Sequence, residues 1–513
     1  MSQPEESLRF PTLAPANKTQ VLRLGRRGDL AQDDSKDGGQ EFPGDPFRAP
    51  RAIFWTALLV RVAYITLGHT WRITPFNNHF EFGWETGRVA ASLAQGHGYS
   101  SPFSGDTGPT TWMVPGFTLL LAGVFKMFGV YSALSAWVIL VLNSLFQALT
   151  VPLVFEMGAR TAGRRTALWA AWIWALYPGI LQYGVRWVWE MSLSTMIFAA
   201  VLVLGMRMRG VGSPAPERPR VRDWAAFGLM WGAISMTNPT LLLMAPVEGL
   251  WILGPRPFEL LRCYWVRWFS RSQNRDLGHP ALVQNQAVRD LGVLPRRAWM
   301  RGAGLAVMSG VLCAAVAAPW AIRNERVFHA FIPTRGNLGA ELALAWAPDS
   351  SGFPWGATVP TLEAAPEHQL YARMGELAYV RMRGKLASQW AREYPAHFWR
   401  LVALRFYMFW ASVPHESGGN QAAETVRATA HCFGSITGIL GLLLALKRRL
   451  PCAGLFAWAV VLLPAIYYLV SAGSRFRNPL EPIFAILTVY LFQQAQGRWG
   501  FRVPGLRRLW PAS

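Results

Sequence analysis

Charged residues are scarce in this sequence. Only 15% of its 513 residues are Asp, Glu, Lys or Arg, whereas ordinary soluble domains contain roughly 25%. Hydrophobic residues make up 52% of the chain. A folded chain with so few charges cannot cover its surface with groups that water solvates. The composition therefore excludes an ordinary soluble domain and indicates a membrane protein.

Acidic residues are the scarcer of the two charged classes. The sequence has 29 Asp and Glu against 50 Lys and Arg, which gives a formal net charge of +21. In a soluble protein such an excess would suggest nucleic acid as a partner. Here the Arg residues cluster between apolar segments, as the positive-inside rule predicts. We therefore expect the lipid bilayer, and no nucleic acid, as a partner.

Cysteine and the common catalytic motifs are also lacking. The four cysteines show neither CxxC nor metal-ligand spacing, which argues against a disulfide framework and a zinc site. GxSxG, HExxH and P-loop patterns are absent, which argues against the common hydrolases and ATP-driven pumps. His79 and His97 lie alone without ligand spacing, so no metal site is predicted.

Long apolar runs, in contrast, are abundant. A helix needs about 20 mostly apolar residues to cross a hydrocarbon core of ~30 Å. The runs that meet or nearly meet this length predict an all-α polytopic membrane protein with about ten transmembrane helices. The predicted spans are 52–69, 131–157, 165–181, 187–206, 224–238, 239–254, 302–321, 431–446, 452–471 and 479–495.

Arginine clusters in the connections predict the topology. Clusters at 160–165, 207–222 and 447–449 alternate with connections that carry few cations, so the clusters belong on the cytosolic side. This predicts a multi-pass protein of the cell inner (cytoplasmic) membrane with both termini in the cytosol. Its parts are a disordered cytosolic tail at 1–50, a transmembrane domain at 51–495 and a basic cytosolic tail at 496–513. The transmembrane domain includes large extracytoplasmic loops at 70–130 and 322–430 and a cytosolic loop at 255–301.

Two segments of the extracytoplasmic loops are apolar or amphipathic but are not predicted to span. If 112–129 crossed the membrane, every later Arg cluster would move outside, so we expect a helix that is buried against the others or lies at the interface. The 370–410 stretch mixes Arg with Trp, Tyr and Phe, as an interfacial helix does. Both large loops are therefore expected to contain interfacial helices.

Ionisable and polar residues gather in four clusters at the extracytoplasmic ends of the predicted spans. Because ionisable groups cost about 2.5–3.5 kcal/mol at membrane depth, those near span ends are candidates for function. The clusters are Glu81, Glu85, Arg88 and Asp106; Arg186 and Glu190; Arg323, Arg335, Asn337 and Glu341; and Arg475 and Arg477.

The first cluster lies in a polar helical stretch, HFEFGWETGRVAASLAQGHG at 79–98. Glu81 and Glu85 share a helical face, where like charges four residues apart repel. One interpretation is the solvated face of an interfacial helix, in which Glu85 pairs with Arg88. The other is that one carboxylate accepts a proton from an attacking hydroxyl while the second raises its pKa or shares a divalent cation. The residues alone leave both open.

The last cluster precedes the final span. Asn478 fits an N-cap, Pro479 the first helical position and Glu481 the third, so a helix should begin there. Arg475 and Arg477 would then stand just outside its positive end, which suits a phosphate group. The same two residues would serve equally well to bind lipid head groups.

Five stretches in order resemble the polytopic glycosyltransferases of the GT-C superfamily. They are GHGYSSPF (96–103), VPGFTLLLAGVFKMFG (114–129), YPGILQYGVRWVWE (177–190), PWAIRNERVF (319–328) and SRFRNPLEPIFAIL (474–487). Within that superfamily the chain, over roughly 52–495, resembles glycosyltransferase family 39 and the RgtA/B/C/D-like domain. It is thereby similar to protein mannosyltransferases and the lipid A aminoarabinose transferase, and the resemblance implies a GT-C type of fold.

The resemblance implies a transferase that takes a hexosyl or pentosyl group from a polyprenyl-phosphate carrier. The acceptor would be a hydroxyl or amine of a glycan, lipid or protein at the extracytoplasmic face. No cofactor is firmly implied, and a divalent cation could take part. The implied catalytic residues are Glu85 as the base, Glu81 as its near alternative, Glu190 in the second loop, and Asp106. The lipid phosphate would be bound by Arg475, Arg477, Arg323, Arg335 and Arg88, with Asn337 and Glu341 in an adjoining acceptor or donor loop.

Two other functions fit the sequence: a transporter or flippase for lipid-linked sugars, and an inactive assembly subunit of an envelope glycan pathway. A transporter predicts ionisable residues in mid-span, and Arg61 in the first span fits that view. The other charges concentrate at span ends and in two large loops, which favours surface chemistry. A relative that had lost activity would keep the fold, so the sequence does not separate an enzyme from an assembly subunit.

Overall fold

The structure, a computed structural model, describes residues 50–73, 82–213, 219–254, 296–352, 366–412 and 421–495. Across these ranges the regular structure is helical, and the β-type pairing is limited to an isolated bridge between Ser100 and Pro109. The all-α prediction is therefore confirmed for the described part of the chain.

Contacts between residues divide the chain into two units, 1–45 and 46–513. Every described residue belongs to the second unit. The predicted tails at 1–50 and 496–513 and the predicted cytosolic loop at 255–301 fall almost wholly outside the described residues, so these three assignments stay predictions.

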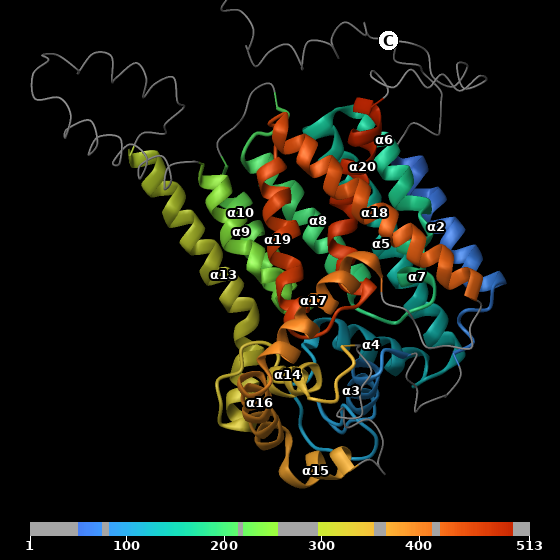
Figure 1. The fold of residues 1–513 in the computed structure, drawn as a ribbon, viewed down its shortest axis with the longest axis vertical. Coiled ribbons are helices and arrows are strands. Elements are labelled where there is room, and N and C mark those ends of the chain that lie inside the picture. The colour runs from blue at the N-terminus through green and yellow to red at the C-terminus, as the bar shows by residue number, and fades with distance from the viewer. Residues whose placement is uncertain are drawn as a thin grey trace, which may run out of the picture. The chain divides into compact units, whose positions relative to one another are not determined.

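A bundle of helices occupies the positions of the predicted spans (Figure 1). Its elements are α2 (Pro50–Leu67), α5 (Ala133–Ala162), α6 (Arg164–Leu176), α7 (Pro178–Val185), α8 (Met191–Met208), α9 (Val221–Ser235), η3 (Pro239–Leu243), α10 (Met244–Leu253), α13 (Arg296–Phe328), α18 (Gln421–Lys447), α19 (Ala453–Leu469), η4 (Ser474–Leu480) and α20 (Glu481–Ala495). By length and composition, five segments are able to cross a membrane: Pro50–Leu67, Ala133–Ala162, Met191–Met208, Met300–Phe328 and Thr425–Lys447. The number of ten spans stays a prediction.

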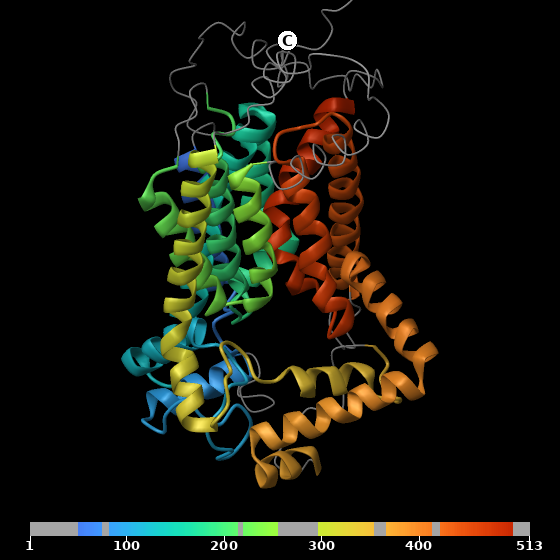
Figure 2. The ribbon, with the colours of Figure 1, turned by 90° about the vertical axis from the view of Figure 1, so that its left-hand side faces the viewer.

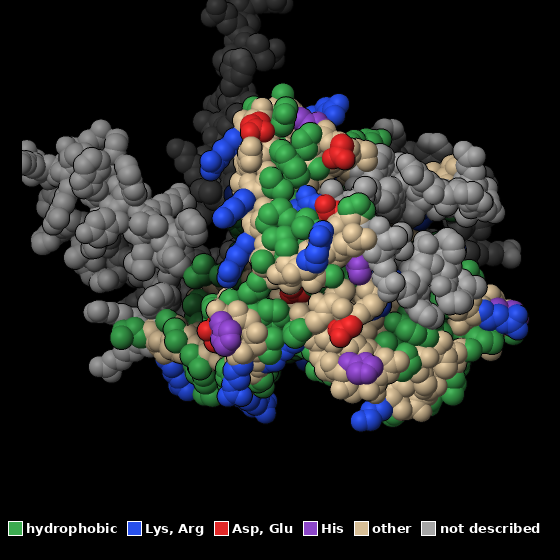
Figure 3. All heavy atoms as spheres, turned by 90° about the horizontal axis from the view of Figure 1, so that it is seen from below, with side chains coloured by type: hydrophobic (Ala, Val, Ile, Leu, Met, Phe, Trp, Pro, Cys, Tyr) green, Lys and Arg blue, Asp and Glu red, His purple; other side chains and the backbone are tan. Residues whose placement is uncertain are grey.

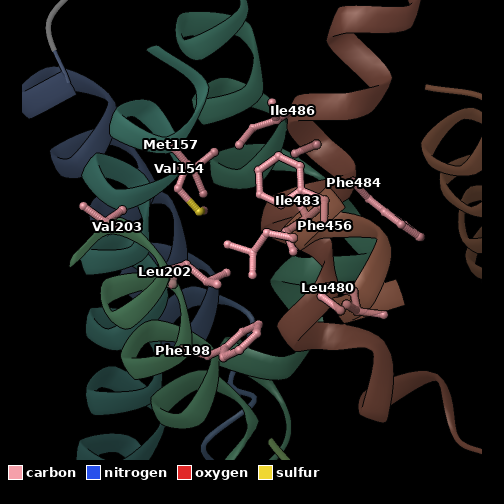
Figure 4. Close-up of a cluster of buried hydrophobic side chains, with 14 of the residues drawn as sticks. Val154, Met157, Phe198, Leu202, Val203, Phe456, Leu480, Ile483, Phe484 and Ile486 are labelled. Atoms are coloured by element: carbon pink, nitrogen blue, oxygen red, sulfur yellow. The ribbon is translucent and has the colours of Figure 1, made fainter. Parts of the chain in front are cut away.

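Apolar packing holds the bundle together. Figure 4 shows side chains of α5, α8, α19 and α20 meeting in the core, where Met157, Phe198 and Ile483 are fully buried. The outward surface is apolar too, since only 22% of the span in α2 and 11% of the span in α13 are buried. Exposed apolar surface of this extent suits contact with lipid chains rather than with water.

A break between α6 and α7 leaves carbonyl groups that need partners. Pro178 begins α7, and proline has no amide hydrogen to give to the preceding turn. The fully buried guanidinium of Arg61 in α2 donates to the carbonyls of Trp174 (3.3 Å) and Ala175 (2.8 Å) in the last turn of α6. Its Nε donates to the side chain of Gln147 (3.0 Å). The mid-span charge of Arg61 is thus used to cap a broken helix.

Figures 1 and 2 place a second group of helices beyond one end of the bundle. It consists of α3 (Glu85–Ala94), α4 (Pro115–Phe128), α14 (Leu338–Trp346), α15 (Pro366–Met374) and α16 (Glu376–Glu393), and α17 (Pro395–Ala411) leads back to the bundle. We call α3, α4 and α14 to α16, with their connecting loops, the external module. With 14 residues, α4 extends about 21 Å, less than a ~30 Å hydrocarbon core.

A buried carboxylate joins the two loops of the external module. Glu376 at the start of α16 accepts hydrogen bonds from the amide (2.6 Å) and hydroxyl (2.5 Å) of Thr111. The hydroxyls of Thr110 and Tyr371 also donate to it, the latter at 2.9 Å. Burial raises the pKa of Glu376, although these hydrogen bonds oppose the rise. Two threonines of the first loop are thereby fixed to a helix of the second.

Candidate functional site

Glu85 begins α3, directly after a tight turn. In that turn Gly83 has φ +89°, and a Cβ there would lie 2.5 Å from the carbonyl oxygen of Val188. The first external loop therefore touches the segment between α7 and α8 backbone to backbone, which only glycine allows. Because Glu190 follows Val188 by two residues, this contact brings Glu85 towards Glu190.

The helix that carries Glu85 is mostly buried, so it does not present the solvated face that one interpretation of the sequence predicted. Residues Thr86 to Ser92 of α3 are all buried, whereas Glu85 is partly exposed at its start. Burial lowers the pKa of Arg88, while the charge of Glu85 opposes this change. Glu81 lies outside the described residues, so its place beside Glu85 stays a prediction.

Glu190 and Arg475 meet near the start of α8. Glu190 directly precedes α8 and is partly buried. Arg475 in η4 lies over the ring of Trp189, with 4.0 Å between its guanidinium carbon and the ring centroid. Burial raises the pKa of Glu190, and Arg475 opposes the rise. Arg335 also opposes it, whereas the charge of Glu85 adds to it.

Glu341 and Arg335 reach the same place from the second external loop. Arg335 is exposed, and its Nε donates to the carbonyl of Trp112 (3.0 Å). Glu341 in α14 accepts a hydrogen bond from the side-chain amide of Asn337 (2.9 Å). Burial raises the pKa of Glu341, and Arg335 opposes the rise. The charge of Glu85 again adds to it.

Five of the predicted residues therefore gather where the external module meets the bundle. Glu190 and Glu341 each interact electrostatically with the same three groups: Glu85 of the first external loop, Arg335 of the second, and Arg475 of η4. We call the set the carboxylate–arginine cluster: Glu85, Glu190, Arg335, Glu341 and Arg475. Such a set can bind an anion through its guanidinium groups beside carboxylates that can accept a proton. Among the described residues, no group of three or more His, Cys, Asp and Glu is arranged to hold a metal ion.

Arg323 and Arg477, two other predicted phosphate ligands, are held by the protein itself. Arg323 donates to the carbonyls of Tyr99 and Thr110, both at 2.8 Å, and so supports the first loop. Arg477 is fully buried and forms an ion pair with Glu481 (2.6 Å). Each guanidinium is thus committed to a structural contact, and the structure does not bring either into the carboxylate–arginine cluster.

Asp106 shapes a turn in the first external loop. Its Oδ1 accepts hydrogen bonds from the hydroxyl of Ser101 and the amide of Gly108, both at 3.2 Å. A carboxylate that bonds its own backbone two residues on is typical of an Asx turn. Of the catalytic candidates in the described residues, Asp106 is the one that the structure places in a local structural role.

The start of the final helix differs from the sequence prediction. The 3₁₀ helix η4 precedes α20, which begins at Glu481 rather than after an Asn478 cap. The amide of Asn478 instead donates to the hydroxyl of Thr195 in α8 (3.0 Å). Because η4 turns tightly, Arg475 and Arg477 point to different partners although they are two residues apart.

Sequence reasoning missed Trp189 and Glu376. Trp189 was open to inference, because it stands beside Glu190 in a tight turn and a tryptophan face attracts a guanidinium. Glu376 gave no signal, because one acidic residue in the first turn of an amphipathic helix is ordinary. Its partners, two adjacent threonines, lie more than 260 residues away in the chain.

Comparisons with known proteins gave matches among solved structures. No protein-family model matches the chain, and no curated protein matches it. The oligosaccharyltransferase of Archaeoglobus fulgidus in complex with Zn and sulfate is 11% identical, with a TM-score of 0.45, over 87% of this chain and 49% of that one. The archaeal oligosaccharyltransferase AglB of the same organism, with an inhibitory peptide and a dolichol-phosphate, is 12% identical, with a TM-score of 0.45, over 90% and 52%. The chain spans about half the length of these proteins.

Proposed function

We propose that this chain is a membrane glycosyltransferase of the GT-C type, similar to family 39 and RgtA/B/C/D-like enzymes. It would transfer a sugar from a polyprenyl-phosphate donor to an acceptor at the extracytoplasmic face of the cell inner membrane. The observation that carries the proposal is the carboxylate–arginine cluster, in which separate segments bring acids and cations to one end of an apolar bundle. The ordered motifs of the sequence support the same function.

Glu85 takes the role of general base in this proposal. Its carboxylate accepts the proton of the acceptor hydroxyl or amine while the oxygen or nitrogen attacks the anomeric carbon. Glu190 is less suited to this role, because it lies beside Arg475, where the leaving phosphate would bind. An acceptor that attacks from the side opposite the leaving phosphate would give inversion at the anomeric carbon.

Arg475 and Arg335 take the role of phosphate ligands. The bond between the anomeric carbon and the phosphate oxygen breaks with both electrons going to the oxygen, and the two guanidinium groups stabilise the charge that develops. The ring of Trp189 lies against the Arg475 guanidinium and would help to hold it in place before the sugar donor binds. The polyprenyl chain would lie along the apolar outer surface of the bundle.

A reconstitution experiment tests the proposal. The purified chain in lipid vesicles is incubated with a panel of radiolabelled polyprenyl-phosphate sugars and candidate acceptors, and release of polyprenyl phosphate is measured. Glu85→Gln should lower the rate about 10²–10⁴-fold, as expected for loss of a general base. Asp349→Asn, which neutralises an exposed carboxylate of the second external loop, is the matched control and should keep the full rate.

The outcomes of this experiment separate the three functions. Full activity of Glu85→Gln would remove Glu85 from the role of base and leave Glu81, Glu190 or Glu341. Movement of labelled donor across the vesicle membrane without release would indicate a transporter. Neither release nor movement in folded protein would indicate an assembly subunit. Addition of a chelator such as EDTA tests whether a divalent cation takes part, because a lower rate would indicate that it does.

A further inference from the structure

A row of cations runs along the solvent face of α16. The opposite face of this helix is buried, through residues that include Tyr379 and Ala387. Arg381, Lys385 and Arg392 are all exposed and follow one another at intervals of four and seven residues, which places them on one side of the helix. We call these three residues the basic stripe. An open groove follows it, lined by Arg381, Gly384, Lys385, Ser388, Gln389, Arg392 and Glu393.

The acidic residues around α16 do not neutralise the basic stripe. Glu367 forms an ion pair with Arg383 on the buried face, and Glu376 is enclosed by hydrogen bonds. Glu393 accepts a hydrogen bond from the side chain of Gln389 (2.7 Å). In the part of the chain that the structure describes, no carboxylate forms an ion pair with any cation of the stripe. Like charges four residues apart, such as Arg381 and Lys385, destabilise a helix, so the stripe lowers the stability of α16.

The stripe lies away from the predicted membrane. Figure 2 shows α16 beyond the end of the bundle, farther from it than α14. Figure 3, seen from that end, shows Lys and Arg side chains in a row along one edge of the face. Lipid head groups would be expected beside the bundle rather than here. On the predicted topology, the positive-inside rule does not account for cations on this helix either.

We propose that the basic stripe binds a linear polyanion, namely a glycan that carries carboxylate or phosphate groups at intervals. At 1.5 Å of rise per residue, the three cations stand roughly 6 Å and 10 Å apart along α16, which suits a chain with repeated charges better than a single anion. The open groove gives an extended chain room to lie along the helix. Exposed cations of this kind attract a polyanion through charge complementarity, and this attraction weakens as the salt concentration rises.

The stripe is connected to the carboxylate–arginine cluster through α14. Gly339 in α14 packs closely on α16, since a Cβ there would lie 2.3 Å from the carbonyl oxygen of Val380. Glu341, two residues on, belongs to the cluster. The helix that carries the stripe is therefore packed directly against the helix that carries Glu341. That this polyanion is the acceptor of the transfer rests on the proposed function, whereas its binding does not.

A binding measurement tests the stripe. The full chain in detergent micelles is titrated into fluorescently labelled polygalacturonate or polyphosphate, with neutral dextran of matched length as the reference, and anisotropy is followed. The triple variant Arg381→Gln, Lys385→Gln, Arg392→Gln should bind both polyanions at least about tenfold more weakly, as the loss of three exposed charges implies. The control variant Arg164→Gln, Lys447→Gln, Arg449→Gln loses the same exposed charge elsewhere and should bind normally.

Each alternative result overturns the proposal. Equal weakening in both triple variants would mean that net charge alone attracts the polyanion. Unchanged binding in the stripe variant would place the site elsewhere. Binding of the stripe to anionic lipid vesicles, with no binding to either polymer, would assign it to the membrane. Because no turnover is measured, failure here is separate from failure of the proposed transferase.

Discussion

The bundle and the external module use charged side chains in different ways. In the bundle, Arg61 gives its donors to carbonyls and to Gln147, and so completes the backbone of a broken helix. In the external module, Glu376 and the ion pair of Glu367 with Arg383 join segments that also share a small buried core of Phe103, Trp112, Met113, Tyr371, Tyr379 and Val380. Arg61 thus supplies missing backbone partners in the bundle, whereas Glu376 adds buried hydrogen bonds between two loops of the module.

The carboxylate–arginine cluster lies between these regions and follows neither pattern. Arg475 rests on an aromatic ring, and among the described residues no acid forms an ion pair with it. Three acids gather near it although their charges oppose one another. Acids and cations gathered at this expense in free energy are those expected of a binding or catalytic site. The comparison thus separates Arg61, whose donors complete the backbone, from Arg475, which rests on the ring of Trp189.

The largest effect should come from removing the carboxylate that joins the two loops. Glu376→Ala leaves the buried hydroxyls and amide of Thr110 and Thr111 without an acceptor, and should cost the external module about 4 kcal/mol of stability. Hydrogen exchange should rise across 99–113 and 366–380 and stay unchanged in the bundle. Equal destabilisation of the bundle would show that Glu376 stabilises the whole molecule rather than the external module alone. Glu393→Ala, at an exposed position on the same helix, is the control.

Arg61→Met should destabilise the bundle rather than the external module. It removes the donors to Trp174 and Ala175 and should lower the free energy of unfolding of the bundle by about 3 kcal/mol. Titration with denaturing detergent, followed by tryptophan fluorescence, measures this change. Arg51→Met, an exposed position on the same helix, should have little effect. Selective loss of sugar transport with normal stability would instead support the transporter function.

Arg475 and Arg477 provide the sharpest pair. Arg475→Ala should weaken binding of polyprenyl phosphate about tenfold with little change in stability, because its guanidinium is proposed to face the ligand. Arg477→Ala should instead lower stability, because it leaves Glu481 and neighbouring buried groups without their partner. Binding assays and thermal unfolding of both variants test the contrast. Equal effects of the two variants on binding and stability would contradict this contrast. The ion pair of Arg477 would then not mark it as structural, and the absence of one among the described residues would not mark Arg475 as a ligand-binding residue.

The smallest effect concerns pH. Burial raises the pKa of Glu376, so the fold favours its protonated form. The resulting stabilisation is present below the usual pKa of the carboxyl and is lost as pH rises through the raised value. The external module should therefore exchange more slowly at acidic than at neutral pH, after correction for intrinsic exchange rates. Glu376→Gln, which stays neutral, should remove this dependence.

Much of the helical arrangement follows from the sequence. Apolar runs long enough to cross a bilayer can be recognised without tertiary information, and each contains helix in the structure. The break at Pro178 was not predicted within the 165–181 run, because its cost depends on whether another helix supplies donors. Arg61 supplies them, and a lone arginine in an apolar run does not reveal its partner.

The site could be predicted as a set of neighbourhoods but not residue by residue. Glu85, Glu190 and Arg475 were found because ionisable residues at span ends are few. Arg475 and Arg477 differ in their contacts because of a 3₁₀ turn and the ring of Trp189. The local sequence pattern around the two arginines does not predict this difference. Glu376 was not predicted, because its structural role depends on hydrogen bonds with a loop that is distant in the sequence.

The cap that Arg61 places on α6 also bears on the order of assembly. Arg61 lies in the first span of the chain, which is synthesised before α6. When the exposed carbonyls of Trp174 and Ala175 enter the membrane, the donor that they need is already there. The cap itself needs no residue of the C-terminal half, although α6 also packs against α20, where Thr166 donates a hydrogen bond to Gln493 (2.6 Å). In a variant without Arg61, these carbonyls would lack this donor from the moment α6 enters the membrane.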